Sequence, residues 1–216
     1  MASQLPLPFE PKPALRREDF IVAPSNAAAV AFVDSFRPGP VQAAALYGPA
    51  GSGKTHLAHA WADVAGGRVI EAAALTRELA ADLDPAINLA VENVDTAAAL
   101  DEVALFALFQ QHRLVLFTGT AHPLTWNASA PDLTSRYRAL PAYGLEAADD
   151  ALLAALARKL FADRQLAVPD PVIARILRSV ERSPAAVRDF VARADAHALA
   201  QKRPITAQLV GDLLGG

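Results

Sequence analysis

A glycine-rich loop between an apolar run and a helical pattern constrains this chain more than any other feature. The loop reads Gly-Pro-Ala-Gly-Ser-Gly-Lys-Thr over residues 48–55; the apolar run 43–47 precedes it and the helical pattern 55–64 follows. Glycines in such a loop let consecutive backbone N–H groups converge on one concavity, and the start of a helix adds partial positive charge. The sequence therefore predicts a phosphate-binding loop of the G-x-x-x-x-G-K-S/T type between a buried strand and a helix.

The side chains of this loop predict a nucleotide, ADP or ATP, held together with Mg²⁺. Lys54 is expected to reach the β- and γ-phosphates, and the Thr55 hydroxyl is expected to bind Mg²⁺. The alternative is an ordinary glycine-rich turn with an exposed lysine. The expected nucleotide-binding residues of this segment are Gly48, Gly51, Ser52, Gly53, Lys54, Thr55 and His56.

Five short apolar runs recur along residues 23–145, with helical patterns between them. Continuous apolar runs are typical of strands buried on both faces, and helices between such strands indicate parallel crossover connections. We therefore expect an α/β nucleotide-binding domain with a five-stranded parallel sheet and helices on both faces. The runs are 43–47, 68–72, 88–91, 114–118 and about 138–143.

The two ends of the chain have different patterns. Residues 1–22 form a proline-rich leader, and prolines remove backbone donors and favour extended geometry. Residues 146–216 contain no strand-like run and are expected to form a small all-helical domain. Its expected helices cover 147–165 and 171–182, a third is capped by Ser183 with Pro184 first, and Thr206 caps a fourth that ends at Gly215.

A second acidic site is expected on a strand near the loop. Glu92 directly follows the apolar run 88–91 and is expected to hold the Mg²⁺ shell. The next residue is Asn93, and an amide cannot take a proton from water at neutral pH. We therefore expect Glu92 and Asn93 to occupy the catalytic positions of a site with weak hydrolysis, while the direction of Asp95 is open. The alternative is that Glu92 only marks the end of a strand.

Composition excludes several classes of protein. The chain has no cysteine, which excludes disulfides, thiolate zinc sites and cysteine nucleophiles. Its net charge of −3 argues against a broad electrostatic grip on nucleic acid. No apolar run approaches a membrane span and no secretory signal pattern is present, so we expect a cytoplasmic protein. His56, His59 and His122 lack a carboxylate at metal-site spacing and are interpreted as packing or surface residues.

Four segments, in the same order, resemble the AAA+ module of DnaA-type initiators over about residues 15–200. The resemblance implies a five-stranded parallel sheet followed by a helical lid. The matching segments are the loop 48–55 with its continuation to Trp61, the adenine-side segment 19–26 with Phe20 and Asn26, the arginine-finger segment 130–136, and the sensor 2 segment 186–190.

This resemblance implies roles for three arginines. Arg136 would be an arginine finger delivered in trans to ATP on a DnaA protomer, and Arg138 is its rival for that role. Arg188 would contact the phosphates of this chain's own nucleotide. A surface ion pair and a solvated helix arginine are the alternatives. Thr120 stands in the sensor 1 segment where DnaA-like proteins tend to carry aspartate, and with Asn93 it argues for slow intrinsic turnover.

Residues 4–9, Gln-Leu-Pro-Leu-Pro-Phe, resemble the sliding-clamp-binding peptide of Hda-type regulators, which are homologous to DnaA. An extended peptide loses little entropy on docking. Gln4 is expected to hydrogen-bond at the rim of a clamp pocket, with apolar anchors supplied by Leu5, Leu7 and Phe9. The alternative is a proline-rich leader without a partner.

Two classes of function follow from the resemblance. The first is a nucleotide-bound, clamp-tethered regulator that activates hydrolysis of DnaA-bound ATP and so represses re-initiation of chromosome replication. The second is a self-sufficient AAA+ ATPase, such as a helicase loader or remodeller. The leader and Asn93 favour the first. Nothing in the chain matches the DNA-binding domain of DnaA, so we expect no direct sequence-specific DNA binding, although association with the replisome and nucleoid is expected. A homodimer is left open.

Overall fold

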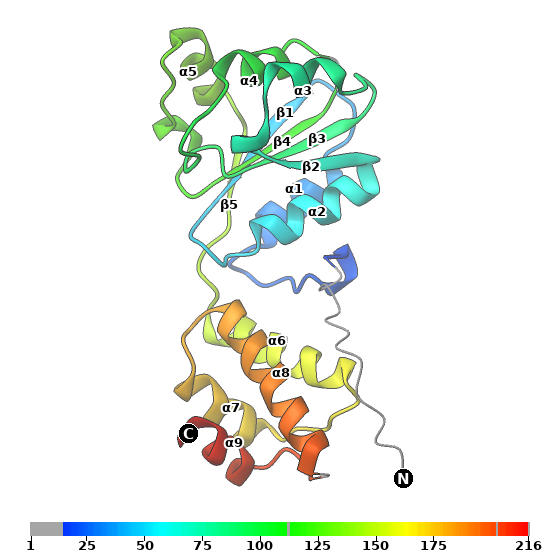
Figure 1. Cartoon of the computed structure of the whole chain (residues 1–216), viewed down its shortest axis with the longest axis vertical. Helices are drawn as coiled ribbons and strands as arrows, with labels where there is room; N and C mark the ends of the chain where they lie inside the picture. Colours follow the sequence, from blue (N-terminus) through cyan, green and yellow to red (C-terminus); the bar gives the residue numbers. More distant parts are fainter. Residues whose placement is uncertain (1–14, 112, 202, 216) are drawn as a thin grey trace.

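The computed structural model describes residues 15–111, 113–201 and 203–215. These residues form two parts that lie one above the other in Figure 1. The upper part contains the β-sheet with helices α1–α5, and the lower part consists of helices α6–α9. The predicted order of an α/β part followed by an all-helical part is therefore observed.

The sheet has five parallel strands in the order β2-β3-β4-β1-β5, which confirms the predicted sheet. Four strands lie within one residue of the expected runs. The fifth expectation is wrong in part, because Arg138 ends helix α5 and the strand begins only at Ala142. The strands are β1 (Ala43–Tyr47), β2 (Gly67–Glu71), β3 (Asn88–Glu92), β4 (Val115–Gly119) and β5 (Ala142–Gly144).

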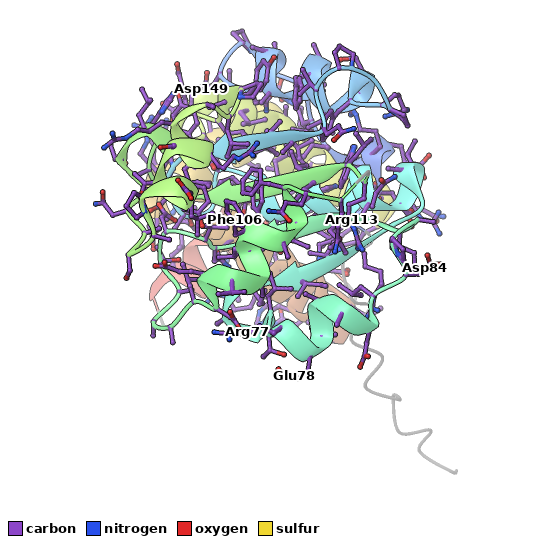
Figure 2. All side chains as sticks on the ribbon, turned by 90° about the horizontal axis from the view of Figure 1, so that it is seen from above. Arg77, Glu78, Asp84, Phe106, Arg113 and Asp149 are labelled. Atoms are coloured by element: carbon purple, nitrogen blue, oxygen red, sulfur yellow. The ribbon has the colours of Figure 1, made fainter. Side chains whose placement is uncertain are left out.

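Helices cover both faces of the sheet, as Figures 1 and 2 show. Side chains alternate along the strands, so β4 presents Phe117 to the cluster under α3, α4 and α5 and Leu116 to the cluster under α1 and α2. Both faces are therefore apolar, which explains the continuous apolar runs in the sequence. The helices are α1 (Ala27–Ser35), α2 (Lys54–Ala65), α3 (Arg77–Asp82), α4 (Glu102–Leu108) and α5 (Pro131–Arg138), with short 3₁₀ turns η2 (Ala72–Ala74) and η3 (Pro123–Thr125).

A buried arginine ties the loop before β3 to the sheet. Arg113 has only 2% of its surface exposed, and its guanidinium donates to the carbonyl oxygen of Ile87 at 3.2 Å. Figure 2 labels it beside the sheet, on the same side of the view as Asp84. The hydrogen bond gives the buried charge a backbone acceptor, since a buried charge without partners is strongly destabilising.

The lower part, called the lid below, consists of α6 (Asp150–Asp163), α7 (Asp170–Ser179), α8 (Pro184–Gln201) and α9 (Ala207–Gly215). Its core contains Phe161, Ile176 and Phe190. Both predicted caps are confirmed. The Ser183 hydroxyl accepts from the N–H of Ala186 at 3.1 Å, and the Thr206 hydroxyl accepts from the N–H of Leu209 at 3.3 Å.

The described end of the leader differs from the extended segment that was expected. Residues 15–22, called the strap below, contain the 3₁₀ turn η1 (Arg17–Asp19) and pass between the two parts. Arg17 donates through Nε and a terminal nitrogen to both carboxylate oxygens of Asp34, at 2.6 and 2.8 Å. This two-point ion pair fixes the strap on α1 and offsets the lack of apolar burial in the turn.

No helix in the described part of the chain is both long and apolar enough to cross a membrane.

Candidate nucleotide-binding site

A cleft of 420 Å³ lies where the strap, the glycine-rich loop and the lid meet. It takes residues from the carboxyl end of the sheet, where the loop follows β1, and from lid helices α6 and α8. Parallel sheets commonly bind ligands at this edge. The residues on its wall are Leu15, Asp19, Phe20, Ile21, Asn26, Ala50, Gly51, Ser52, Gly53, Lys54, Thr55, His56, Asn93, Thr120, Leu152, Leu156, Pro184 and Arg188.

The backbone of the loop requires glycine at two positions. A Cβ at Gly48 would collide with the carbonyl oxygen of Leu145. Gly53 has φ +103°, and a Cβ there would lie 2.8 Å from the ring of Phe20. Both contacts come from close approach by neighbouring segments, and Gly53 also has a backbone that side chains rarely adopt. The glycines therefore allow the loop to lie against the strap and the end of the sheet.

The ammonium of Lys54 lies over the loop. Its Nζ donates to the carbonyl oxygens of Gly48 at 2.6 Å and Pro49 at 2.9 Å. Burial lowers the pKa of Lys54, and the charges of Asp95 and Glu92 oppose that shift. Phosphate oxygens in the concavity would be stronger acceptors for this cation than the two neutral carbonyls.

The structure brings Glu92 to the Lys54–Thr55 end of the cleft. Glu92 is 3% exposed at the end of β3, and its Oε1 accepts no hydrogen bond from any described residue. Burial raises the pKa of Glu92, and the Thr55 side chain opposes that rise. A buried carboxylate oxygen without a partner, next to a hydroxyl, fits a hydrated Mg²⁺.

Such an ion would need more ligands than the protein offers. Over the described ranges, no group of three or more His, Asp or Glu side chains is arranged to hold a metal ion. Mg²⁺ usually keeps several waters and binds through one or two carboxylates plus substrate phosphates. The residues present therefore fit Mg²⁺ bound together with a nucleotide.

The structure resolves the direction of Asp95. Its carboxylate accepts from the N–H and hydroxyl of Thr120, with distances between 2.8 and 2.9 Å, and from the N–H of Ala121 at 2.7 Å. These bonds fasten the segment that follows β4 to the segment that follows β3. Asp95 is thus occupied in holding Thr120 at the wall of the cleft. Asn93 also lies on that wall.

Asn26 and His56 shape the wall near Phe20 with bonds inside the protein. The side-chain oxygen of Asn26 accepts from the N–H of Ala23 at 2.9 Å, and its nitrogen donates to the carbonyl of Ile21 at 3.0 Å. His56 Nε2 lies 2.8 Å from the carbonyl oxygen of Arg16, and its ring meets that of Phe20 edge-on at 5.2 Å. Burial lowers the pKa of His56, which favours the neutral ring. The ring of Phe20 is an apolar part of this wall.

Among the described residues of the lid, Arg188 brings a positive charge to the cleft wall. Arg188 on α8 is half-buried, and burial lowers its pKa. It forms no ion pair with any described residue. A half-buried guanidinium without a carboxylate partner is suited to an anionic ligand such as phosphate.

Sequence reasoning missed several residues of the wall, among them Leu152, Leu156 and Pro184. The helical spacing of apolar residues in α6 predicted that this helix packs in the lid core. The spacing did not indicate that the apolar residues at one end of the helix face a cleft. Of the other predicted residues, His59 is exposed, and the His122 ring packs against Tyr47 at 4.7 Å.

Arg136 and Arg138 lie away from the cleft. Both are exposed in the last turn of α5, and neither forms an ion pair within the described residues. Arg136 lines a depression with Gln42 and Ala43 at the beginning of β1, whereas the glycine-rich loop follows the end of β1. Two residues apart on a helix, the two arginines point to nearly opposite sides. Gln4, Leu5, Leu7 and Phe9 fall outside the described residues.

Comparisons with known proteins address the fold. Neither a protein-family model nor a curated protein matches the chain. Domain III of the replication initiation protein DnaA from Thermotoga maritima has a TM-score of 0.74 at 18% identity, covering 94% of this chain and 96% of that one. AMPPCP-bound DnaA from Aquifex aeolicus has a TM-score of 0.69 at 18% identity, covering 88% and 69%. A Thermotoga maritima RuvB variant has a TM-score of 0.68 at 16% identity, covering 87% and 66%. The chain therefore has the AAA+ fold in its DnaA-like form, a five-stranded parallel sheet between helices followed by a helical lid.

Proposed function

We propose that this chain is a nucleotide-bound AAA+ regulator that promotes hydrolysis of DnaA-bound ATP in trans and so represses re-initiation of chromosome replication. A sliding clamp would tether it through residues 4–9. The observation that carries the proposal is a separation between two features. The cleft follows the end of β1, whereas Arg136, which forms no ion pair with any described residue, lies near the beginning of that strand.

Binding of ADP or ATP with Mg²⁺ is supported by the lining of the cleft. The glycine-rich loop, Lys54 and Arg188 would supply N–H donors and cations for phosphates, and Thr55 on the wall, together with the neighbouring Glu92, would supply oxygens for the ion. Phe20 offers an apolar face for a base. One similar structure, DnaA from Aquifex aeolicus, was solved with the ATP analogue AMPPCP.

Action in trans is supported by the separation between Arg136 and the cleft. The five residues of β1 separate the two regions, which corresponds to about 16 Å of extended chain. Arg136 is therefore badly placed to stabilise charge on this chain's own nucleotide but free to meet a partner. An arginine finger of this kind can accelerate phosphoryl transfer by about 10³–10⁵.

A self-sufficient ATPase is the second candidate, and the Glu92–Thr55 arrangement is the observation that favours it. Against it, Asn93 is an amide at the position where a general base is expected, and the carboxylate of the nearby Asp95 is hydrogen-bonded to Thr120. A general base contributes about 10²–10⁴ to the rate of a proton-transfer step. We therefore place the chain's own turnover well below the rate it confers on a partner.

The test is conversion of DnaA-bound ATP to ADP with clamp loaded on DNA. Arg136→Ala should remove stimulation while nucleotide affinity and clamp binding stay unchanged, because the side chain acts only across the interface. Arg138→Ala is the matched control from the same helix turn and should stimulate normally. Stimulation by Arg136→Ala equal to that of the wild type would contradict the assignment. Brisk turnover by the isolated wild type would favour the second candidate.

A further inference from the structure

A carboxylate on the neighbouring strand contacts the amide that follows β3. Glu71 ends β2 and Glu92 ends β3, and the two are register partners in the parallel sheet. Asn93 comes next, with φ +61°, and its Nδ2 donates to Glu71 Oε2 at 2.9 Å. Its backbone N–H donates to the Thr118 hydroxyl at 3.1 Å. Asn93 is therefore held at two points, one on each neighbouring strand.

The contact with Glu71 determines which way the amide faces. An ionised carboxylate only accepts hydrogen bonds, so the NH₂ side of Asn93 must face Glu71. The bond is charge-assisted and hence stronger than a neutral one. The opposite side of the amide carries Oδ1, which accepts no hydrogen bond from any described residue. Asn93 also lines the cleft, together with Lys54 and Thr120.

We propose that Glu71 is a positioning residue that fixes the Asn93 amide, so that Oδ1 accepts a hydrogen bond from the water that attacks a terminal phosphate. The inference rests on the proposed binding of ATP. In this reaction the water oxygen bonds to the γ-phosphorus, the bond to the β–γ bridging oxygen breaks, and ADP leaves. The water proton passes to a phosphate oxygen, since an amide orients water without taking its proton. Hydrolysis is then slow but depends on Asn93.

Two other roles of the pair must be distinguished. Glu71 could itself be the base that takes the proton. Alternatively, Asn93 could be present only because asparagine tolerates a left-handed backbone, with Glu71 as an incidental partner. Replacements at position 71 separate these roles. Glu71→Gln keeps an acceptor for the amide but cannot act as a base, and Glu71→Lys offers only donors and reverses the amide.

The first readout needs no nucleotide. The side-chain NH₂ resonances of Asn93 are assigned in ¹H–¹⁵N spectra by their loss in Asn93→Asp. In the wild type we expect one proton shifted downfield by its bond to a carboxylate. That shift should shrink in Glu71→Gln and vanish in Glu71→Lys. NH₂ resonances that are the same in all three proteins would overturn the contact itself.

The second readout combines nucleotide affinity with single-turnover hydrolysis. Glu71→Lys should lower the hydrolysis rate by about tenfold or more, while Glu71→Gln keeps it within about threefold. Affinity for ATP should be unchanged in both, and Glu181→Lys on the lid is the charge-matched control. Equal loss in both Glu71 variants would make Glu71 the base and overturn the proposal. Equal hydrolysis rates in all the proteins would mean that the Glu71–Asn93 pair is only a structural contact, and would also overturn the proposal.

A gain of activity is the most specific outcome. The double variant Glu71→Gln with Asn93→Asp puts an acid at the water and keeps an amide beside it; aspartate tolerates the same backbone. Its hydrolysis rate should rise by about 10²-fold. Asn93→Asp alone should gain less, because it sets two carboxylates side by side. No gain in the double variant would overturn the positioning role. Absence of ATP binding by the wild type would instead mean that the proposed function has failed.

Discussion

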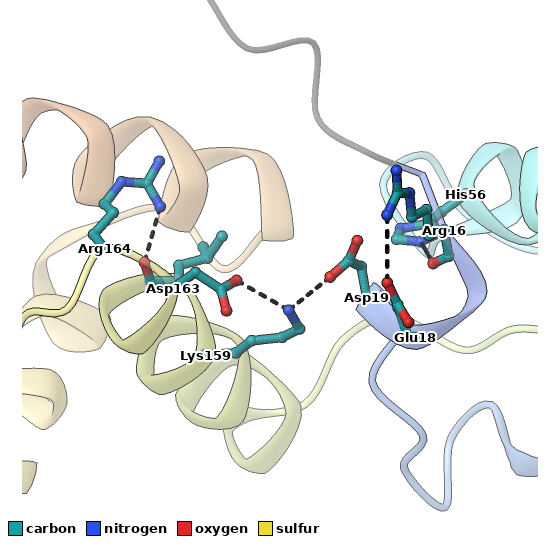
Figure 3. Close-up of polar contacts among 8 residues, drawn as sticks. Arg16, Glu18, Asp19, His56, Lys159, Asp163 and Arg164 are labelled. Carbon is teal, nitrogen blue, oxygen red and sulfur yellow. Dashed lines mark hydrogen bonds and ion pairs between the residues drawn. The ribbon is translucent and has the colours of Figure 1, made fainter.

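An ion pair joins the lid to the strap beside the cleft. Figure 3 shows the Lys159 ammonium between two carboxylates, Asp19 of the strap and Asp163 one turn further along α6. The distances are 2.7 Å to Asp19 Oδ1 and 2.9 Å to Asp163 Oδ2. Asp19 lies on the wall of the cleft. Lys159→Ala should therefore weaken nucleotide binding although Lys159 does not line the cleft.

The size of the expected loss in nucleotide affinity follows from how exposed the Lys159 and Asp19 side chains are. The two side chains of the Lys159–Asp19 pair are 28% and 30% exposed, so water screens part of their attraction. Exposed pairs contribute about 0.2–1 kcal/mol, and this half-buried one should lie near the upper end. Since the pair can shift the lid toward the closed cleft by no more than its own energy, the loss of affinity is at most about fivefold.

The assay is calorimetry with ADP on the wild type, Lys159→Ala, Asp19→Asn and the double variant. The two single changes should each weaken binding by about two- to fivefold, and the double change should add nothing further. Comparing all four proteins separates the contribution of the ion pair from any direct effect of Asp19 on the ligand. Asp163→Asn is the control, because it touches the same lysine but not the strap. Additive single effects, or an equal loss in Asp163→Asn, would mean that the Lys159–Asp19 pair does not strengthen nucleotide binding.

Three further predictions concern other parts of the chain. Two backbone N–H groups of the loop before α5 hold the pKa of Glu102 below its usual value. Ionised Glu102 therefore stabilises the folded chain fully at pH values above the ordinary pKa of glutamate, and this contribution is lost as the pH falls through the lowered pKa. Glu102→Gln should lower the free energy of unfolding by about 0.5–1 kcal/mol at neutral pH and by almost nothing in acid, as urea titrations at both pH values would show; an equal loss at both would contradict this. Gly53→Ala should destabilise the fold more than Gly66→Ala in thermal melts, because both have positive φ but only the first meets a side chain; equal losses would contradict the contact. A variant lacking residues 1–10 should melt like the wild type and lose binding to immobilised sliding clamp; retained binding would contradict the leader's role.

Most of the sheet was predictable because each strand is marked by a pattern within its own few residues. Both faces of the strands are covered by helices, so four strands are continuous apolar runs and stand out in the sequence. The fifth was misplaced because an apolar stripe of α5 extends into it. Leu133, Tyr137 and Leu140 follow helical spacing and are buried together, so the run 138–143 mixes the end of a helix with the start of a strand.

Residue patterns alone predicted the part of the candidate site that one segment builds, whereas Phe20, Asn26 and Arg188, which also line the cleft, were expected from the resemblance to DnaA-type initiators. The glycine-rich loop carries its whole pattern in eight residues, and the expected strand and helix flank it. The contacts of Asp19 with Lys159 and of Asp95 with Thr120 join residues 140 and 25 positions apart, so no local pattern reveals them. Glu71 was missed for the same reason, because the sheet register brings it to Asn93.

The cleft between the sheet domain and the lid is expected to hold an adenine nucleotide. Calorimetric titration of ADP with Mg²⁺ into the wild type and Lys54→Ala measures this binding. We expect one binding site in the wild type and a loss of about 10- to 100-fold in affinity in the variant, because a charge-assisted bond to phosphate is removed. No binding by the wild type, or equal affinity of the two proteins, would contradict it.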